Sequence, residues 1–257
     1  MRNAMRTGLI VAAILAVLTV TEYLFATRVN DDLVRFLGIA ASAIGKAGLI
    51  AYYFMHIYRL WRPQEAHYMA LATAHQPAAH APAHNQLAIK RAGLWLFFFS
   101  ESILFGLLLS ARFYLEGIHR EELDQVLGLA ITVILLLSSV TAYTAETAIE
   151  HDNKKVASWY LFFTILLGVI FAGGVAYEWS IAHFHRYESF GSIFFTMTGI
   201  HATHVVTGVF MLILVWIQAL RGRYSSKNPW AVSAVVMYWH FVDVVWVFYY
   251  PALYLTK

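Results

Sequence analysis

Seven long apolar runs constrain this sequence more than any other of its features. A helix needs roughly 20 consecutive apolar residues to cross a hydrocarbon core of about 30 Å. Runs of that order occupy residues 8–26, 33–58, 92–111, 125–145, 156–177, 191–220 and 230–255. They lack the alternating pattern of barrel strands, and with 60% hydrophobic and 13% charged residues the chain has more apolar surface than a soluble core would bury. The sequence therefore predicts an all-α integral membrane protein with about seven transmembrane helices.

A stretch of different composition interrupts the apolar runs. Residues 61–87 are rich in alanine, histidine and proline, which is typical of a linker. Four histidines in it could bind a metal, although such segments are more often solvated tethers: His67, His75, His80 and His84. The linker divides the chain into a two-helix unit, residues 1–60, and a five-helix unit, residues 88–257, whose short loops predict one compact bundle.

The distribution of charge predicts an orientation. If the amino terminus is cytoplasmic, the segments on that side hold most of the basic residues, among them Arg59, Lys90 and Lys155. The positive-inside rule then places the carboxyl terminus on the outer side. A formal charge of +3 is too small and too scattered to predict a nucleic-acid partner. The absence of cysteine excludes disulfides, thiolate metal sites and iron–sulfur clusters.

Glu101 is the most informative residue because it lies in the middle of an apolar run. An ionised carboxylate near the bilayer midplane costs about 2.5 to 3.5 kcal/mol on insertion scales. We therefore expect Glu101 to be protonated, or to pair with a polar group on another helix.

Two later runs carry polar pairs that could supply this partner. His201 and His204 are three positions apart and share one face of their helix, and His240 and Asp243 repeat that spacing on the next. With Glu101, these residues predict a polar seam inside the bundle. The seam has no catalytic residues of its own in this interpretation. Two tryptophans beside the second pair add indole donors, Trp239 and Trp246.

Other polar residues in the runs are less informative. Three glutamates lie near predicted helix ends, where water or headgroups would solvate them: Glu22, Glu146 and Glu178. Lys46 lies in the middle of the second run, and its long stem would let the amine reach toward the interface, so a functional role and snorkelling are both open.

Three kinds of site could use the polar seam. A diiron site would need Glu-x-x-His pairs on several helices, and the seven runs contain none. A haem site would need axial histidines, but the carboxylates here would pair with His201, His204 and His240 instead. A hydrogen-bonded network that joins helices and influences proton movement is the reading that the chemistry favours.

Several segments of the five-helix unit resemble subunit III of the haem-copper terminal oxidases, in the order found in that family. They are Ser100 and Glu101 within a run of phenylalanines, Ser138 to Thr141, Tyr177 and Glu178, the stretch 191–205, and Tyr238 to Trp246. A match this long in the last two runs is highly specific, unlike an isolated pair of histidines.

The resemblance implies a subunit without redox centres or a metal site, within a cytochrome c or quinol oxidase of an aerobic respiratory chain. Haem and copper would lie on partner subunits, namely the catalytic subunit I and subunit II. The resemblance also implies that the chain binds phospholipid, supports proton uptake by its partner and protects it during turnover. In the family's polar network, Glu101 would pair with His204.

The front unit resembles a different subunit. Lys46 and the Phe-Met-His ending at residues 54–56 are similar to the small bacterial oxidase subunit IV, which implies a IV and III fusion in the bacterial cytoplasmic membrane. Two alternatives remain. One is a freestanding proton or ion carrier that uses the polar seam as a relay. The other is the subunit III homologue that accompanies bacterial nitric oxide reductase.

Overall fold

The computed structural model describes residues 2–29, 31–55, 83–114, 123–226 and 228–256. Across these ranges it contains seven helices that are long and apolar enough to cross a membrane, judged by length and composition. The prediction of an all-α membrane protein with about seven spans is confirmed. The side chains of the four linker histidines, His67, His75, His80 and His84, lie outside the described residues, as does His56.

The helices follow the predicted apolar runs closely. They are α1 (Arg2–Arg28), α2 (Asp32–Leu49), α4 (Ala83–Tyr114), α5 (Gln125–Glu150), α6 (Lys154–Ile181), α7 (Ser189–Leu220) and α8 (Trp230–Tyr250), with π turns η1 (Ile50–Phe54) and η4 (Pro251–Leu255) extending α2 and α8. Most helices run a few residues past the prediction, because hydropathy marks the bilayer core and not the polar turns beyond it. Helix α4 begins well before its apolar run, inside the predicted linker, where proline ends and helix-forming residues begin.

Short polar side chains start several of the helices. The carboxylate of Asp31 accepts a hydrogen bond from the backbone N–H of Val34 at the start of α2. Asp124 caps α5 in the same way, and the Asn153 side chain caps α6. A capping side chain satisfies backbone N–H groups that have no partner within the helix. Each of these three helices therefore begins at a defined residue.

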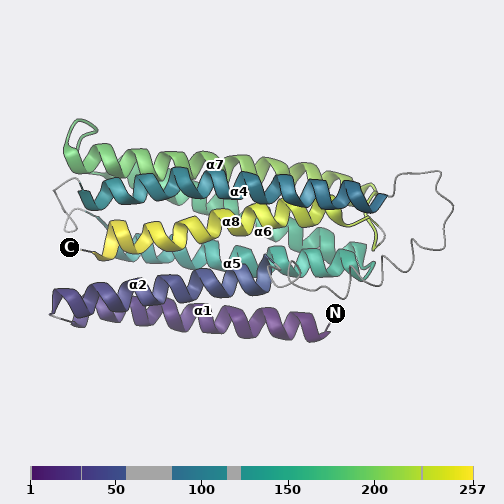
Figure 1. The fold of residues 1–257 in the computed structure, drawn as a ribbon, viewed down its shortest axis with the longest axis horizontal. Coiled ribbons are helices and arrows are strands. Elements are labelled where there is room, and N and C mark those ends of the chain that lie inside the picture. Colours follow the sequence, from purple (N-terminus) through teal and green to yellow (C-terminus); the bar gives the residue numbers. More distant parts are fainter. Residues whose placement is uncertain (1, 30, 56–82, 115–122, 227, 257) are drawn as a thin grey trace.

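Helix α8 occupies the centre of the bundle. In Figure 1 the helices run along one common direction, and α8, in yellow, lies between α4 and α7 on one side and α5 and α2 on the other. Helices α5, α6 and α7 pack in sequence, α8 contacts α5 and α7, and the α1–α2 hairpin packs against α5 and α8. Consequently α8 is the most buried of the seven spans, and α4, on the periphery, is the least buried.

Glycine allows the helices next to α8 to approach its largest side chain. Trp239 of α8 is fully buried. A Cβ atom added to Gly168 of α6 would lie 2.6 Å from the Trp239 ring, and one added to Gly208 of α7 would lie 2.9 Å from it. Small residues at such positions let membrane helices pack closely. The indole N–H of Trp239 also donates to Ser138 Oγ on α5, at 2.8 Å, so this single side chain contacts three neighbouring helices.

Candidate functional site

The first polar group joins α4, α7 and α8. His204 Nε2 lies 3.3 Å from Glu101 Oε2, and the two side chains are 19% and 21% exposed. His204 Nδ1 lies 2.9 Å from the carbonyl oxygen of Ile200, and the Tyr238 hydroxyl donates to the His204 carbonyl at 3.1 Å. The structure therefore places Glu101 beside His204, the partner expected for it from the sequence.

The geometry around His204 restricts where its protons can lie. A carbonyl oxygen can only accept, so Nδ1 carries the proton that it donates to Ile200. Nε2 therefore either accepts a proton from a neutral Glu101 carboxyl group or, as part of an imidazolium, donates one to the carboxylate. A hydrogen bond between Oε2 and Nε2 thus needs one proton, and the transfer of that proton from one atom to the other would need no rotation of the side chains.

The second polar group lies between α5 and α8. Ser139 Oγ donates a hydrogen bond to Asp243 Oδ2, and His240 Nδ1 lies 3.3 Å from Ser139 Oγ. His240 Nδ1 is also 3.7 Å from Asp243 Oδ2, and both of these side chains are fully buried. Since the serine proton is directed at the carboxylate, His240 Nδ1 must donate to Ser139. The result is a short chain of hydrogen bonds from His240 through Ser139 to Asp243.

The third polar group is centred on His201. This fully buried ring donates from Nε2 to the carbonyl oxygen of Val242 on α8, at 3.1 Å. Its Nδ1 then carries a lone pair, and this atom is buried with no hydrogen-bond partner among the described residues. The ring also packs against Trp246, whose indole N–H donates to Thr132 Oγ1 at 2.9 Å. These contacts join α5, α7 and α8.

The predicted polar seam is thus divided into separate groups. His204 points to α4 and His201 to α8, although the two residues are only three positions apart on one helix. His240 and Asp243 find their shared partner, Ser139, on α5. Ser139 entered the sequence analysis only within the stretch from Ser138 to Thr141 that resembles the family. A side chain on the neighbouring helix determines each grouping, and the spacing along one helix does not show it.

A buried ion pair that the sequence did not predict joins α1 to α2. Lys46 Nζ and Glu22 Oε2 form a salt bridge, and both side chains are fully buried. One turn away, Ser42 Oγ donates to the Leu18 carbonyl at 2.9 Å. The lysine therefore pairs across the hairpin and does not reach for the interface. In each of these two pairs the residues are 24 positions apart in the sequence. No periodic pattern within one helix would reveal such a separation.

Glutamates expected to be solvated at helix ends are buried as well. Glu22, Glu146 and Glu178 are 0%, 3% and 2% exposed. The Tyr254 hydroxyl donates to Glu178 Oε2 at 2.5 Å, across from η4 to α6. The sequence analysis also missed Arg112, a buried side chain that donates from Nε to the Ala252 carbonyl at 3.1 Å. The expectation of solvation was wrong because other parts of the chain cover these carboxylates, with Lys46 of α2 beside Glu22 and Tyr254 of η4 beside Glu178.

No metal centre is evident in the described part of the chain. Within it, no three histidine, aspartate or glutamate side chains gather where one ion could bind them all. The imidazoles of His201, His204 and His240 each form a hydrogen bond inside the bundle instead. The chemistry that this arrangement offers is the placement and short-range transfer of protons.

Two family models match the sequence. The model for Cytochrome c oxidase subunit III matches residues 71–256, and the model for Prokaryotic Cytochrome C oxidase subunit IV matches residues 9–74. The first range holds all three polar groups around Glu101, His201 and His240. The second holds the Glu22–Lys46 ion pair. The two ranges meet within the segment predicted to be a linker.

Curated relatives of the chain share one name, Cytochrome c oxidase subunit 3. The protein of Thermostichus vulcanus is 31% identical over 182 residues, which are 67% of this chain and 90% of the relative. That of Cyanidium caldarium is 33% identical over 178 residues, 64% of this chain and 66% of the relative. That of Drosophila melanogaster is 40% identical over 124 residues, 48% of this chain and 47% of the relative, so the match spans about half the length of the insect protein.

Proposed function

The chain belongs to the cytochrome c oxidase subunit III family, and from this premise we propose that it serves as a non-catalytic subunit of a respiratory terminal oxidase. The observation that carries the proposal is the family match over residues 71–256, which includes α4 to α8 without interruption. In the described part of these helices, Glu101, His201, His204, His240 and Asp243 form hydrogen bonds within the bundle, and we assign none of them to a catalytic centre.

The proposal divides the work of the oxidase among its chains. Haem and copper would lie on the catalytic subunit I and on subunit II, and this chain would dock on them within the membrane. Its three polar groups would hold α4, α5, α7 and α8 together, since hydrogen bonds between side chains contribute about 1 kcal/mol each inside a membrane protein. Only one of these groups is also suited to exchange protons with its surroundings.

That group is the pair of Glu101 and His204. Both side chains are about one-fifth exposed, whereas His240 and Asp243 are completely enclosed by the chain. We propose that Glu101 and His204 share a proton at the surface of the bundle and support proton uptake by the catalytic subunit. The groups around His201 and His240 would have a positioning role.

The front unit indicates which kind of complex the chain would join. A match to the prokaryotic subunit IV over residues 9–74 favours an oxidase in a bacterial cytoplasmic membrane over a nitric oxide reductase. We propose that α1 and α2 fill a place beside α5 and α8 in the complex, with the amino terminus in the cytoplasm and the carboxyl terminus outside. Lipid would cover the remaining apolar faces.

A freestanding proton or ion carrier is the alternative from a different class. Carriers of this kind bind their substrate where a helix is broken near the midplane. Here the described spans α4 to α8 are continuous, and the π turns η1 and η4 lie at the ends of α2 and α8. This continuity favours the subunit over the carrier.

The proposal is tested by isolating the tagged chain from its native membrane in a mild detergent. A reduced-minus-oxidised spectrum and mass spectrometry would identify what accompanies it, with membranes from an untagged strain as the control. We expect haem absorbance together with a large multi-helix partner. A colourless chain recovered alone, under conditions that keep other respiratory complexes intact, would contradict the proposal and favour the carrier.

A further inference from the structure

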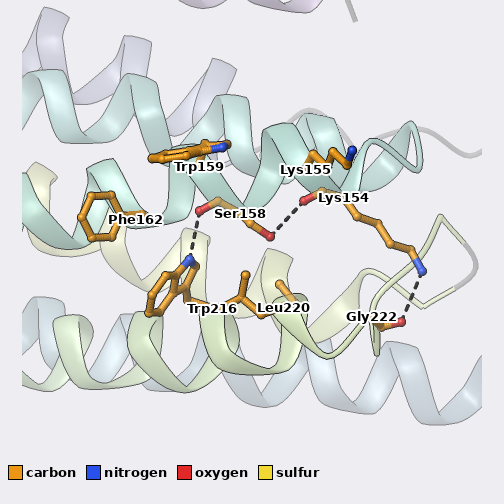
Figure 2. Close-up of a pocket in the computed structure, with 9 residues that line it drawn as sticks. Lys154, Lys155, Ser158, Trp159, Phe162, Trp216, Leu220 and Gly222 are labelled. Atoms are coloured by element: carbon orange, nitrogen blue, oxygen red, sulfur yellow. Dashed lines mark hydrogen bonds between the residues drawn. The ribbon is translucent and has the colours of Figure 1, made fainter.

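A groove lies between the start of α6 and the end of α7, away from the three polar groups. Its volume is about 540 Å³, within the range of roughly 300 to 1,000 Å³ that small-molecule sites occupy. Aromatic and aliphatic side chains form its walls, with two lysines at one end (Figure 2): Trp159, Phe162, Trp216, Leu220, Lys154 and Lys155.

The apolar wall of the groove is held in place by contacts within the chain. Trp216 of α7 donates from its indole N–H to the carbonyl oxygen of Ser158 on α6, at 3.0 Å. The Phe162 ring lies beside it, with ring centroids 5.8 Å apart. Trp159 and Leu220 remain 64% and 60% exposed. The groove therefore has a fixed floor between two helices and an apolar rim that faces away from the bundle.

Positive charge is concentrated at one end of this groove. Lys154 and Lys155 are the first two residues of α6, where the positive end of the helix dipole adds to their charge. Lys154 Nζ uses one hydrogen bond on the carbonyl oxygen of Gly222, at 3.3 Å, which leaves two of its donors free. Asp152, in the preceding turn, is already bound to Ser226.

The position of the groove along the helices indicates what kind of molecule would fill it. Lys154 and Lys155 are the first residues of the candidate span of α6, so in a membrane they would lie near the lipid headgroups. Trp159 and Trp216 lie farther along the helices (Figure 2), where such rings gather at the interface. Basic pockets between helices on the cytoplasmic side are suited to lipids with a negative headgroup. In the proposed orientation this end of the bundle faces the cytoplasm.

We propose that this groove binds an anionic phospholipid. The phosphate group would lie at Lys154 and Lys155, and an acyl chain would lie along Trp216, Phe162 and Leu220. A free phosphate would match the lysines but leave the apolar wall uncovered, and a zwitterionic lipid would cover the wall but carry no net charge for the lysines. The inference deepens the lipid binding included in the proposed function, by naming a site and a class of headgroup.

The test measures lipid binding to the tagged chain with whatever partners accompany it, after detergent has removed loosely held lipid. Dioleoyl phosphatidylglycerol and dioleoyl phosphatidylcholine are titrated separately, and bound lipids are counted by native mass spectrometry. The variants are K154Q/K155Q, which removes both charges, and K154R/K155R, which keeps them. The matched control is K90Q/R91Q, which removes two exposed charges at the same end of the bundle, on α4.

We expect the chain to bind phosphatidylglycerol more tightly than phosphatidylcholine, and K154Q/K155Q to weaken phosphatidylglycerol binding by about tenfold or more. The arginine variant and the α4 control should bind as the unchanged chain does, and an excess of inorganic phosphate should not displace the lipid. Equal binding by K154Q/K155Q, or no preference between the two lipids, would overturn the inference. Haem absorbance of the same sample reports on the proposed function separately, so the two can fail independently.

Discussion

Glu101 and His204 are partly exposed, whereas His201, His240 and Asp243 are fully buried. The side chains of Glu101 and His204 are about one-fifth exposed, and His204 Nε2 lies 3.3 Å from Glu101 Oε2. Glutamine at position 101 would keep a hydrogen-bond partner for His204 Nε2 but could not release a proton. Alanine would remove the partner as well. The two substitutions therefore separate a role in proton exchange from a role in packing.

We predict that Glu101→Gln leaves assembly with the catalytic subunit nearly unchanged but alters sustained oxygen consumption. Glu101→Ala should also weaken docking, because His204 loses its partner at a cost of about 1 kcal/mol, the low end for a partly exposed group. The haem content per tagged chain measures docking, and the decline of oxygen uptake with time measures turnover. Ser110→Ala, exposed on the same helix, is the control. If all three variants matched the unchanged oxidase, Glu101 would have no part in the mechanism.

The ion pair of Glu22 and Lys46 has a different character because the chain encloses it completely. Removing one member leaves a buried charge without compensation, at a cost of about 3 to 5 kcal/mol, while replacing both with apolar residues is often neutral or stabilising. Lys46→Met alone should therefore lower the thermal stability and yield of the chain in detergent, and Glu22→Leu with Lys46→Met should restore them. Lys90→Met, exposed on α4, should change neither. A double variant as unstable as the single one would show that the charge itself is required.

The residues that sequence reasoning identified, and those that it missed, differ in a physical way. Glu101 and His204 are unusual in any apolar run, and their type alone marks them. Glu22 and Lys46 are equally unusual, but each could have reached solvent toward a helix end. Only the packing of α1 against α2 shows that the two residues pair instead. Ser139 lies in a stretch that resembles the family, but its residue type does not identify it as a partner of Asp243, because serine in a membrane helix commonly bonds its own backbone.

At the level of the helices, the sequence predicts where the spans lie but not how they pack against one another. The apolar runs predicted each span to within a few residues, apart from the early start of α4. They did not predict that α8 lies at the centre, since all seven runs are similarly apolar. What distinguishes α8 is its set of large side chains, such as Trp239, which need small residues on the helices opposite.

A pair of glycines on α6 tests this account of the packing. Gly168 lies against Trp239, which is held by Ser138 and cannot move aside easily, whereas an added Cβ at Gly173 would meet nothing within 4 Å. Gly168→Ala should destabilise the bundle by about 1 to 3 kcal/mol through overpacking. Gly173→Ala should be neutral or stabilise it by up to about 1 kcal/mol, because alanine favours helix. Thermal unfolding of the purified proteins would rank the stabilities of the two variants. A lower stability for Gly173→Ala than for Gly168→Ala would contradict the prediction.

Across the whole molecule, the two units matched by different families are in direct contact. Phe54, at the end of the front unit, stacks on His240 of α8 with ring centroids 5.0 Å apart, and it lies 5.2 Å from the ring of Tyr143 on α5. The front unit thus covers the group of His240, Ser139 and Asp243 from one side. Residues 61–87 are predicted to link the two units along the chain. The contacts of Phe54 indicate that packing between the units, and not this covalent link, holds them together.

We therefore predict that residues 1–60 and 61–257, produced together as separate chains, still associate. The tagged front chain should recover the other one from detergent-solubilised membranes, in lower yield than in the fused protein, because the linker raises the effective concentration of one unit near the other. Phe54→Ala should reduce this recovery further, since it removes the ring that packs on His240, and Tyr52→Ala, an exposed ring in the same turn, should not. A front chain recovered alone in every case would mean that the units cannot associate without their link, and the division into two units would then describe the ancestry of the sequence and not the folding of the protein.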